Sequence, residues 1–259
     1  MKTLVVANQK GGVGKSTVCV GTAYAAIEAQ KRVLLVDFDR QGSLSTSFPP
    51  TGVDDGAATT ASQLFADQAN IRPEVLAPGL SILRADDTLS LLSGVNEEGI
   101  KRPARYLKEL ASEFDVCIID TPGVLGINPP MTIAALVAAN AVVCPFGVGL
   151  YESKALADLW AYLSGVRTNG YNPKLRLMGL LPSKVHTSSR EEMDALDSLR
   201  EQFGQVILPL MLGERAAVKQ SIAKRKPVWK GTRGSGHLKA AQEWKAATQY
   251  ILSDLGVIK

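Results

Sequence analysis

Six short apolar runs recur along the chain, and each has the length of a β-strand. The apolar residues within a run are continuous rather than alternating with polar ones, which is typical of strands covered on both faces of a parallel sheet. We therefore expect strands at Thr3–Asn8, Val33–Asp37, Val116–Asp120, Ala141–Pro145, Leu175–Leu181 and Val206–Leu210.

Stretches with apolar residues at helical spacing separate these runs. Strand followed by helix, repeated along the chain, predicts right-handed crossovers and one doubly wound, mostly parallel α/β sheet flanked by helices. No internal repeat or shift in composition marks a domain boundary, so we expect a single domain over residues 1–259. The predicted helices are Lys15–Ala29, Lys101–Ser112, Pro130–Ala139, Glu152–Thr168, Arg190–Phe203, Arg215–Lys224 and His237–Leu255.

Composition narrows the class of protein. Of the 259 residues 46% are hydrophobic and 21% charged, and this balance excludes collagen-like and disordered chains. No apolar run approaches the roughly 20 residues that a bilayer span needs, and the first residues enter a strand directly, so we expect a cytoplasmic protein. The odd number of cysteines, Cys19, Cys117 and Cys144, all within apolar segments, indicates reduced core thiols.

The net charge of +4 conceals an uneven distribution. Residues 214–245 hold nine basic and two acidic side chains, whereas the rest of the chain holds 20 basic and 23 acidic ones. Positive charge is therefore concentrated near the C-terminus, which would suit a polyanionic partner.

A glycine-rich loop follows the first predicted strand and leads directly into a helix. Three glycines in four positions let backbone N–H groups converge on phosphate oxygens, and the helix N-terminus adds its positive dipole end. Lys15 would reach the β- and γ-phosphates, and the Ser16 hydroxyl would ligate Mg²⁺. The usual phosphate loop has glycine where this chain has Gln9, so this is a variant with an additional lysine. Its expected nucleotide contacts are Lys10, Gly11, Gly12, Val13, Gly14, Lys15, Ser16 and Thr17.

Three aspartates lie at the ends of the second and third predicted strands. Water molecules around a nucleotide-bound Mg²⁺ need carboxylate acceptors, and Asp120 is placed to supply one. Asp39 is placed to orient the attacking water or accept its proton, while Asp37 supports the site by hydrogen bonding. The sequence thus predicts a nucleotide hydrolase with Mg²⁺ held mostly through water by Ser16, Asp37, Asp39 and Asp120.

The motifs together resemble a known family. The segments from Lys10 to Thr17, from Asp37 to Gln41 and from Asp120 to Gly123 look like the deviant Walker A, switch I and Walker B regions of the ParA/MinD ATPases. Within that superfamily the chain is similar to the short ParA-type plasmid partition proteins. It is especially similar to the IncC-type proteins, in its opening residues and in Leu181–Val185 and Lys226–Trp229.

The resemblance implies an ATP-dependent homodimer in which Lys10 crosses to the nucleotide of the opposite subunit. It implies Mg-dependent ATP hydrolysis with Lys10, Lys15 and Asp39 as catalytic residues, stimulated by a ParB-type centromere-binding protein. The ATP-bound dimer would coat DNA without reading its sequence, placing the protein on the nucleoid during plasmid or chromosome segregation.

Two residues depart from the family pattern. Arg40 replaces the usual proline of switch I, which bears on the rate of hydrolysis, and Arg225 replaces the usual glycine before Lys226 and Pro227. The second change adds positive charge to the basic region.

Taken alone, the basic region would be read as a solvated charged face; with the resemblance, DNA binding is favoured. Sequence-independent binding needs cations that meet phosphates, and no helix-turn-helix or zinc-finger pattern is present. The expected DNA contacts are Lys184, Arg190, Arg215, Lys219, Lys224, Arg225, Lys226, Lys230 and Arg233.

Several alternatives stay open at this point. A relative that positions a protein cargo would share every motif. A MinD-like membrane protein would end in a basic amphipathic helix, which residues 253–259 do not form. An iron–sulfur carrier would need paired cysteines that bridge a dimer. The adenine contacts are also open, with Pro182, Ser183 and Pro209 as candidates.

Overall fold

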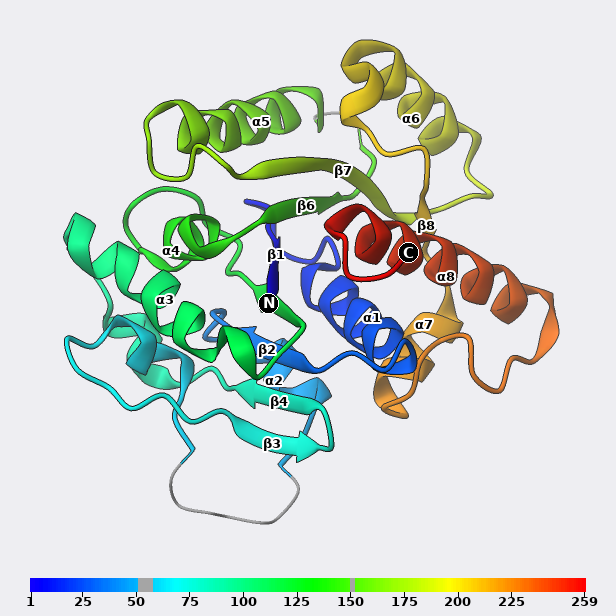
Figure 1. The fold of residues 1–259 in the computed structure, drawn as a ribbon. Helices are drawn as coiled ribbons and strands as arrows, with labels where there is room; N and C mark the ends of the chain where they lie inside the picture. The colour runs from blue at the N-terminus through cyan, green and yellow to red at the C-terminus, as the bar shows by residue number, and fades with distance from the viewer. Residues whose placement is uncertain (51–57, 150–151) are drawn as a thin grey trace.

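The protein is described by a computed structural model that covers residues 1–50, 58–149 and 152–259. Its centre is an eight-stranded sheet in the order β3-β4-β2-β5-β1-β6-β7-β8 (Figure 1). β3 runs antiparallel to β4, and every other pair of neighbours is parallel. The strands are β1 (Lys2–Val6), β2 (Val33–Asp37), β3 (Glu74–Ala77), β4 (Leu80–Leu83), β5 (Val116–Asp120), β6 (Ala141–Phe146), β7 (Arg176–Val185) and β8 (Leu212–Gly213).

Helices cover both faces of the sheet, which confirms the predicted doubly wound α/β class. α1 and α8 lie side by side on one face, and α3, α4 and α5 lie on the other (Figure 1). The helices are α1 (Lys15–Glu28), α2 (Ser43–Ser47), α3 (Glu97–Glu109), α4 (Met131–Ala138), α5 (Glu152–Thr168), α6 (Arg190–Phe203), α7 (Ala216–Ala223) and α8 (Gly234–Leu255). Short 3-10 turns occur at Ala61–Phe65, Asp87–Leu91, Leu110–Ser112 and Gly204–Val206.

The buried strand residues divide between two hydrophobic clusters. Along β1, Leu4 and Val6 pack toward α1 and α8, while Val5 packs toward α4 and α5. All three side chains are fully buried. Because successive side chains of a strand point to opposite faces, a strand covered on both sides must be apolar at every position.

The prediction was least accurate around the last two strands. β7 extends to Val185, so Pro182, Ser183 and Lys184 lie in the strand. The predicted strand Val206–Leu210 is wrong: Gly204–Val206 is a 3-10 turn, Ile207 makes only an isolated bridge with Leu180, and the strand at this edge is β8. Pro209 has no N–H to donate, which disfavours a continuous ladder through this segment.

The sequence reading missed the β3–β4 hairpin at the other edge. Each strand has only four residues, and every second residue of β3 is exposed, so neither forms a long apolar run. The hairpin nevertheless matters for the site, because β4 pairs with β2 and ends beside the loop that carries Asp39.

Candidate functional site

The loop between β1 and α1 has the backbone geometry of a phosphate cradle. Gly12 and Gly14 have φ angles of 77° and 93°, in the left-handed region that favours glycine. A Cβ atom added at Gly11 or Gly12 would meet nothing within 4 Å, whereas Val13 between the glycines is buried. The loop therefore combines an anchored side chain with open space over its backbone.

Lys15, the first residue of α1, points back across this loop. Its Nζ donates a hydrogen bond to the carbonyl of Lys10 at 3.0 Å, and its side chain is buried. Burial lowers the pKa of Lys15, while the charges of Asp120 and Asp39 act in the opposite direction. The ammonium group is thus held among carboxylates under the cradle. Ser16 and Thr17, the next two residues, are half-buried.

Asp120 at the end of β5 is the most unusual charge of the site. It is fully buried, and neither carboxylate oxygen has a hydrogen-bond partner among the described residues. Burial, and secondarily the nearby Asp37, raises its pKa to about 7, while the neighbouring Ser16 hydroxyl and the Lys15 ammonium group act in the opposite direction. A buried carboxylate without a partner is costly, so this position fits a cation or a coordinated water better than it fits a purely structural role.

The turn after Asp120 packs against the phosphate loop. A Cβ atom at Gly123 would approach the Gly11 nitrogen to 3.3 Å and Lys15 Nζ to 3.5 Å. The Thr121 hydroxyl donates to the carbonyl of Val6 at the end of β1. The three sequence motifs thus lie together at the carboxyl ends of the strands, because β1, β2 and β5 are parallel neighbours.

Asp37 and Asp39 differ in how their carboxylates are used. Asp37 is buried and accepts hydrogen bonds from the Ser45 amide, the Ser45 hydroxyl and the Asp39 amide. Burial raises the pKa of Asp37 to about 6, while these hydrogen bonds act in the opposite direction. Asp39 is half-buried and accepts only from the Gln41 amide among the described residues. Asp39 is therefore the more available of the two for water or substrate.

Lys10 has a partner that the sequence reading did not foresee. Its Nζ forms an ion pair with Glu152 Oε1 at 2.6 Å, at the start of α5. The Glu152 side chain is 13% exposed and that of Lys10 is 42% exposed. Asn8 accepts a hydrogen bond from the Lys10 amide and donates one to the carbonyl of Pro145. The chain separation of 142 residues explains why no local signal could indicate the ion pair.

A mostly apolar pocket of about 360 Å³ lies next to the phosphate loop. Gly14, Thr17 and Ser183 lie on its loop side, and Leu212, Val218 and Ile222 supply apolar wall. Of the three residues expected to contact adenine, Ser183 lines the pocket, while Pro182 and Pro209 are not among its lining residues. The sequence shows that α7 has apolar residues, but it does not show that α7 packs beside the phosphate loop. The pocket wall could therefore not be predicted from the sequence.

Within residues 214–245, three of the cations expected to contact DNA form ion pairs. Arg215 pairs with Glu243 of α8, with both side chains largely buried. Lys219 pairs with Glu214 at 2.6 Å, and Lys230 lies 3.3 Å from Glu28. Trp229 beside it donates to the same Glu28 and packs against the core on the α8 side. These ion pairs reduce the charge available to an external phosphate.

Three of the remaining cations line a groove of about 690 Å³, together with Glu214 and the paired Arg215. Lys224, Lys226 and Arg233 line it, and none of them forms an ion pair within the described residues. Arg225 lies between the two lysines with a φ of 52°. Lys184 on β7 is exposed, and Arg190 at the start of α6 lies 3.8 Å from Asp194. The groove is therefore a basic, solvent-facing surface.

Two observations bear on the alternative classes. In the part of the chain that the structure describes, no helix combines the length and the apolar character needed to cross a bilayer. Cys19, Cys117 and Cys144 are buried free thiols, and burial raises the pKa of each. Buried thiols on α1, β5 and β6 do not form the exposed pair that a cluster shared between subunits would require.

Comparison with known proteins places this geometry in context. A family model described as an AAA domain matches residues 1–177. Protein IncC of Escherichia coli is 32% identical over 262 residues, which cover 99% of this chain and 70% of that protein. The chromosome-partitioning ATPase Soj of Thermus thermophilus is 30% identical over 258 residues, covering 96% of this chain and 97% of Soj.

The fold has solved counterparts as well. The septum site-determining protein MinD of Pyrococcus horikoshii, in its complex with Mg-ADP, superposes with a TM-score of 0.73 at 19% identity, covering 99% of this chain and 98% of MinD. Sequence relatives of this extent, together with three motifs at one sheet edge, identify the family. The chain belongs to the ParA/MinD superfamily of P-loop ATPases, among its plasmid and chromosome partition proteins.

Proposed function

We propose that this chain is a partition ATPase that binds Mg-ATP, dimerises in that state and binds DNA without sequence preference. Hydrolysis, stimulated by a ParB-type centromere-binding partner, returns it to a form that releases DNA. This cycle would keep the protein on the nucleoid and move a plasmid or chromosome. IncC and Soj as relatives support the partition role.

The observation that carries the proposal is the buried Asp120 carboxylate beside an open phosphate cradle. Among the described residues, neither Asp120 oxygen has a hydrogen-bond partner, and a Cβ atom at Gly11 or Gly12 would meet nothing within 4 Å. Such a site fits Mg²⁺, whose retained waters need carboxylate acceptors. Ser16 and Asp120 would hold the ion, and Asp39 would accept from its water. When bound, Mg²⁺ neutralises charge on the β- and γ-phosphates.

Different residues of the chain have different roles in hydrolysis. Asp39 orients the attacking water and accepts its proton, since within the described parts of the chain only its Oδ1 accepts a hydrogen bond. Lys15 stabilises the charge that develops on the transferred phosphoryl group. The backbone N–H groups of residues 11–16 at the start of α1 bind phosphate oxygens. The adenine would occupy the apolar pocket lined by Ser183, Val218 and Ile222.

Dimerisation would use Lys10. In the single chain Lys10 is paired with Glu152, so its transfer to the nucleotide of a second subunit requires this ion pair to break. The phosphate offers a denser negative charge than one carboxylate and therefore favours the exchange. ATP binding and dimer formation would be linked through this side chain.

DNA binding would use the basic groove. Lys224, Arg225, Lys226 and Arg233 are the primary phosphate contacts, and Lys184 and Arg190 extend the surface. Arg215, Lys219 and Lys230 are secondary contacts, because each is already paired. Since phosphate contacts carry no sequence information, the binding would be non-specific and sensitive to salt.

The test compares three nucleotide states. Binding to unrelated DNA duplexes is measured at several salt concentrations with Mg-ATP or a non-cleavable analogue, with Mg-ADP and without nucleotide. We expect salt-sensitive binding with ATP or its analogue and much weaker binding in the other two states. Equal binding in all three states would refute the nucleotide switch. Absence of any affinity for Mg-ATP would refute the ATPase assignment itself.

A further inference from the structure

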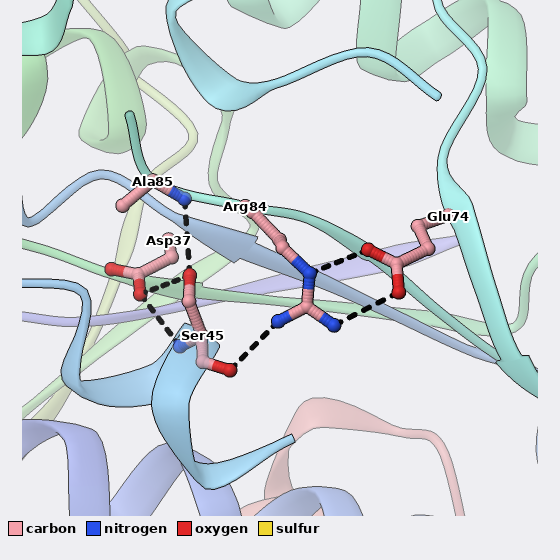
Figure 2. A network of polar contacts seen from close by, with 5 residues as sticks. All are labelled: Asp37, Ser45, Glu74, Arg84 and Ala85. Atoms are coloured by element: carbon pink, nitrogen blue, oxygen red, sulfur yellow. Dashed lines mark hydrogen bonds and ion pairs between the residues drawn. The ribbon is translucent and has the colours of Figure 1, made fainter. Parts of the chain in front are cut away.

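A continuous network of polar contacts connects the Asp39 loop to the edge of the sheet. Asp37 Oδ1 accepts from the Asp39 amide at 3.2 Å. Asp37 Oδ2 accepts from the Ser45 amide at 2.8 Å and from the Ser45 hydroxyl at 2.7 Å (Figure 2). The backbone that carries Asp39 is thus attached to a buried carboxylate, which is in turn held by the first turn of α2.

Ser45 is held from its other side by the segment that follows β4. Its hydroxyl oxygen accepts a hydrogen bond from the Ala85 amide at 3.0 Å, while its carbonyl accepts one from Arg84 Nη1 at 2.7 Å (Figure 2). The amide, hydroxyl and carbonyl of Ser45 therefore make four hydrogen bonds in total. Two of these bonds are to Asp37, and two are to the segment after β4. Ser45 joins the end of β2 to the end of β4.

Arg84 completes the network at the edge hairpin. Its Nε and Nη2 donate to the two carboxylate oxygens of Glu74 on β3 (Figure 2). The side chains of Arg84 and Glu74 are 17% and 19% exposed, so this bidentate ion pair is largely shielded from water. The Arg84 carbonyl also accepts from the Ala61 amide at 2.8 Å. A bidentate, shielded arginine fixes direction as well as charge.

We infer that Ser45 and Arg84 are positioning residues for hydrolysis, which hold the Asp37 carboxylate and, through the Asp39 amide, the loop that carries the Asp39 side chain. The inference rests on the proposed ATPase function. Neither residue belongs to the phosphate loop or is among the residues that line the apolar pocket. Their effect is on geometry: misplacing a reacting group by about 1 Å can cost on the order of 100-fold in rate.

The opposite end of β2 offers a control with the same pattern of hydrogen bonds at a more exposed position, since the Arg32 side chain is 50% exposed and that of Arg84 is 17% exposed. Arg32 has the same arrangement of contacts as Arg84. Its Nε and Nη2 donate to Asp115 and its Nη1 donates to the carbonyl of Ser112. It lies just before the first residue of β2, at the amino-terminal end of that strand, whereas Asp39 follows the carboxyl end. Both arginines join neighbouring segments, but only Arg84 is connected to the Asp39 loop.

The experiment measures ATP turnover with saturating Mg-ATP and DNA for four variants: Ser45→Ala, Ser45→Thr, Arg84→Met and Arg32→Met. Loss of the Ser45 hydroxyl should lower kcat about 10-fold while changing the KM for ATP less than twofold. Ser45→Thr keeps the hydroxyl and should retain at least half of the wild-type kcat. Arg84→Met should lower kcat several-fold, and Arg32→Met should leave it unchanged. Thermal melting of each variant is recorded alongside.

The outcomes separate the two hypotheses. If the wild-type chain hydrolyses ATP and both Ser45→Ala and Arg84→Met keep kcat within twofold of it, the positioning role is overturned. Equal losses in Arg84→Met and Arg32→Met, in step with their melting temperatures, would overturn it too, since stability alone would then explain the effect. Wild-type protein that binds Mg-ATP but never hydrolyses it would overturn the proposed function, a result seen before any variant is compared.

Discussion

The phosphate loop and the basic region of residues 214–245 hold their charges in opposite ways. At the phosphate loop, Lys15 is buried among aspartates, and the Asp120 carboxylate has no hydrogen-bond partner in the described structure. In the basic region, most cations lie near the surface, and Arg215, Lys219 and Lys230 already have carboxylate partners. A buried charge that lacks a partner points to a ligand, because leaving it alone is costly. An exposed charge carries no such cost and is much weaker grounds for a function.

The largest effect is expected at Lys15. Lys15→Ala removes the ammonium group from beneath the phosphate cradle, and turnover should fall by at least about 100-fold, as for removal of one preorganised donor. Phosphate release at saturating Mg-ATP is the measurement. Lys108→Ala, at an exposed position of α3, is the control and should match wild type. A Lys15→Ala variant with more than a tenth of wild-type turnover would show that the buried lysine is structural.

The next effect concerns Asp120 and the stability of the nucleotide-free protein. Its pKa is raised to about 7 in the folded state, so the folded protein retains this proton where the unfolded chain has lost it. The free energy of unfolding should therefore decrease between about pH 4 and pH 7 on account of this group. Asp37, with a pKa of about 6, adds to the decrease over the lower part of that range.

Asp120→Asn removes this ionisation and tests its cost. Without nucleotide, the variant should be more stable than wild type at pH 8, by roughly 2–4 kcal/mol, and the gain should shrink toward pH 4. Denaturant unfolding at both pH values measures it. The same variant should bind ATP with little dependence on Mg²⁺. A variant less stable than wild type at pH 8 would mean that Asp120 is satisfied in the nucleotide-free protein.

A smaller effect distinguishes free from paired cations in the basic region. Lys226→Ala should lower the salt dependence of DNA binding by about one released counterion, as for the loss of one phosphate contact. Lys230→Ala should lower it less, because Lys230 already lies beside Glu28. Binding titrations over a range of salt concentrations give both slopes. Equal decreases in salt dependence would show that an ion pair within the chain does not reduce a lysine's contribution to DNA binding.

The smallest effect is expected at Glu152. Glu152→Gln removes the partner of Lys10, so ATP-dependent dimerisation should strengthen by about two- to fivefold, the worth of a partly exposed ion pair. Sedimentation with a non-cleavable ATP analogue measures the dimer, and Lys10→Ala provides the opposite control, in which the dimer should be lost. Weaker dimerisation of Glu152→Gln would mean that Glu152 itself contributes to the contact between subunits.

The sequence was sufficient for those parts of the fold and site that depend on neighbouring residues. The strands β1, β2, β5 and β6 were predicted within a few residues because they are buried on both faces and read as unbroken apolar runs. The phosphate loop was recognisable because strand, glycines and helix are consecutive. The β3–β4 hairpin was missed because its strands are short and one of them is half-exposed.

What the sequence by itself determined is the chemistry available: a glycine-rich loop with two lysines, aspartates at strand ends and an excess of cations in residues 214–245. The tertiary structure decided which of these groups have partners. Lys10 meets Glu152, Arg215 meets Glu243, and Arg84 joins Glu74 to Ser45, whereas Asp120 meets no partner in the described residues. The reason is physical: charge is a property of a residue, but burial and pairing depend on distances between segments far apart in the chain.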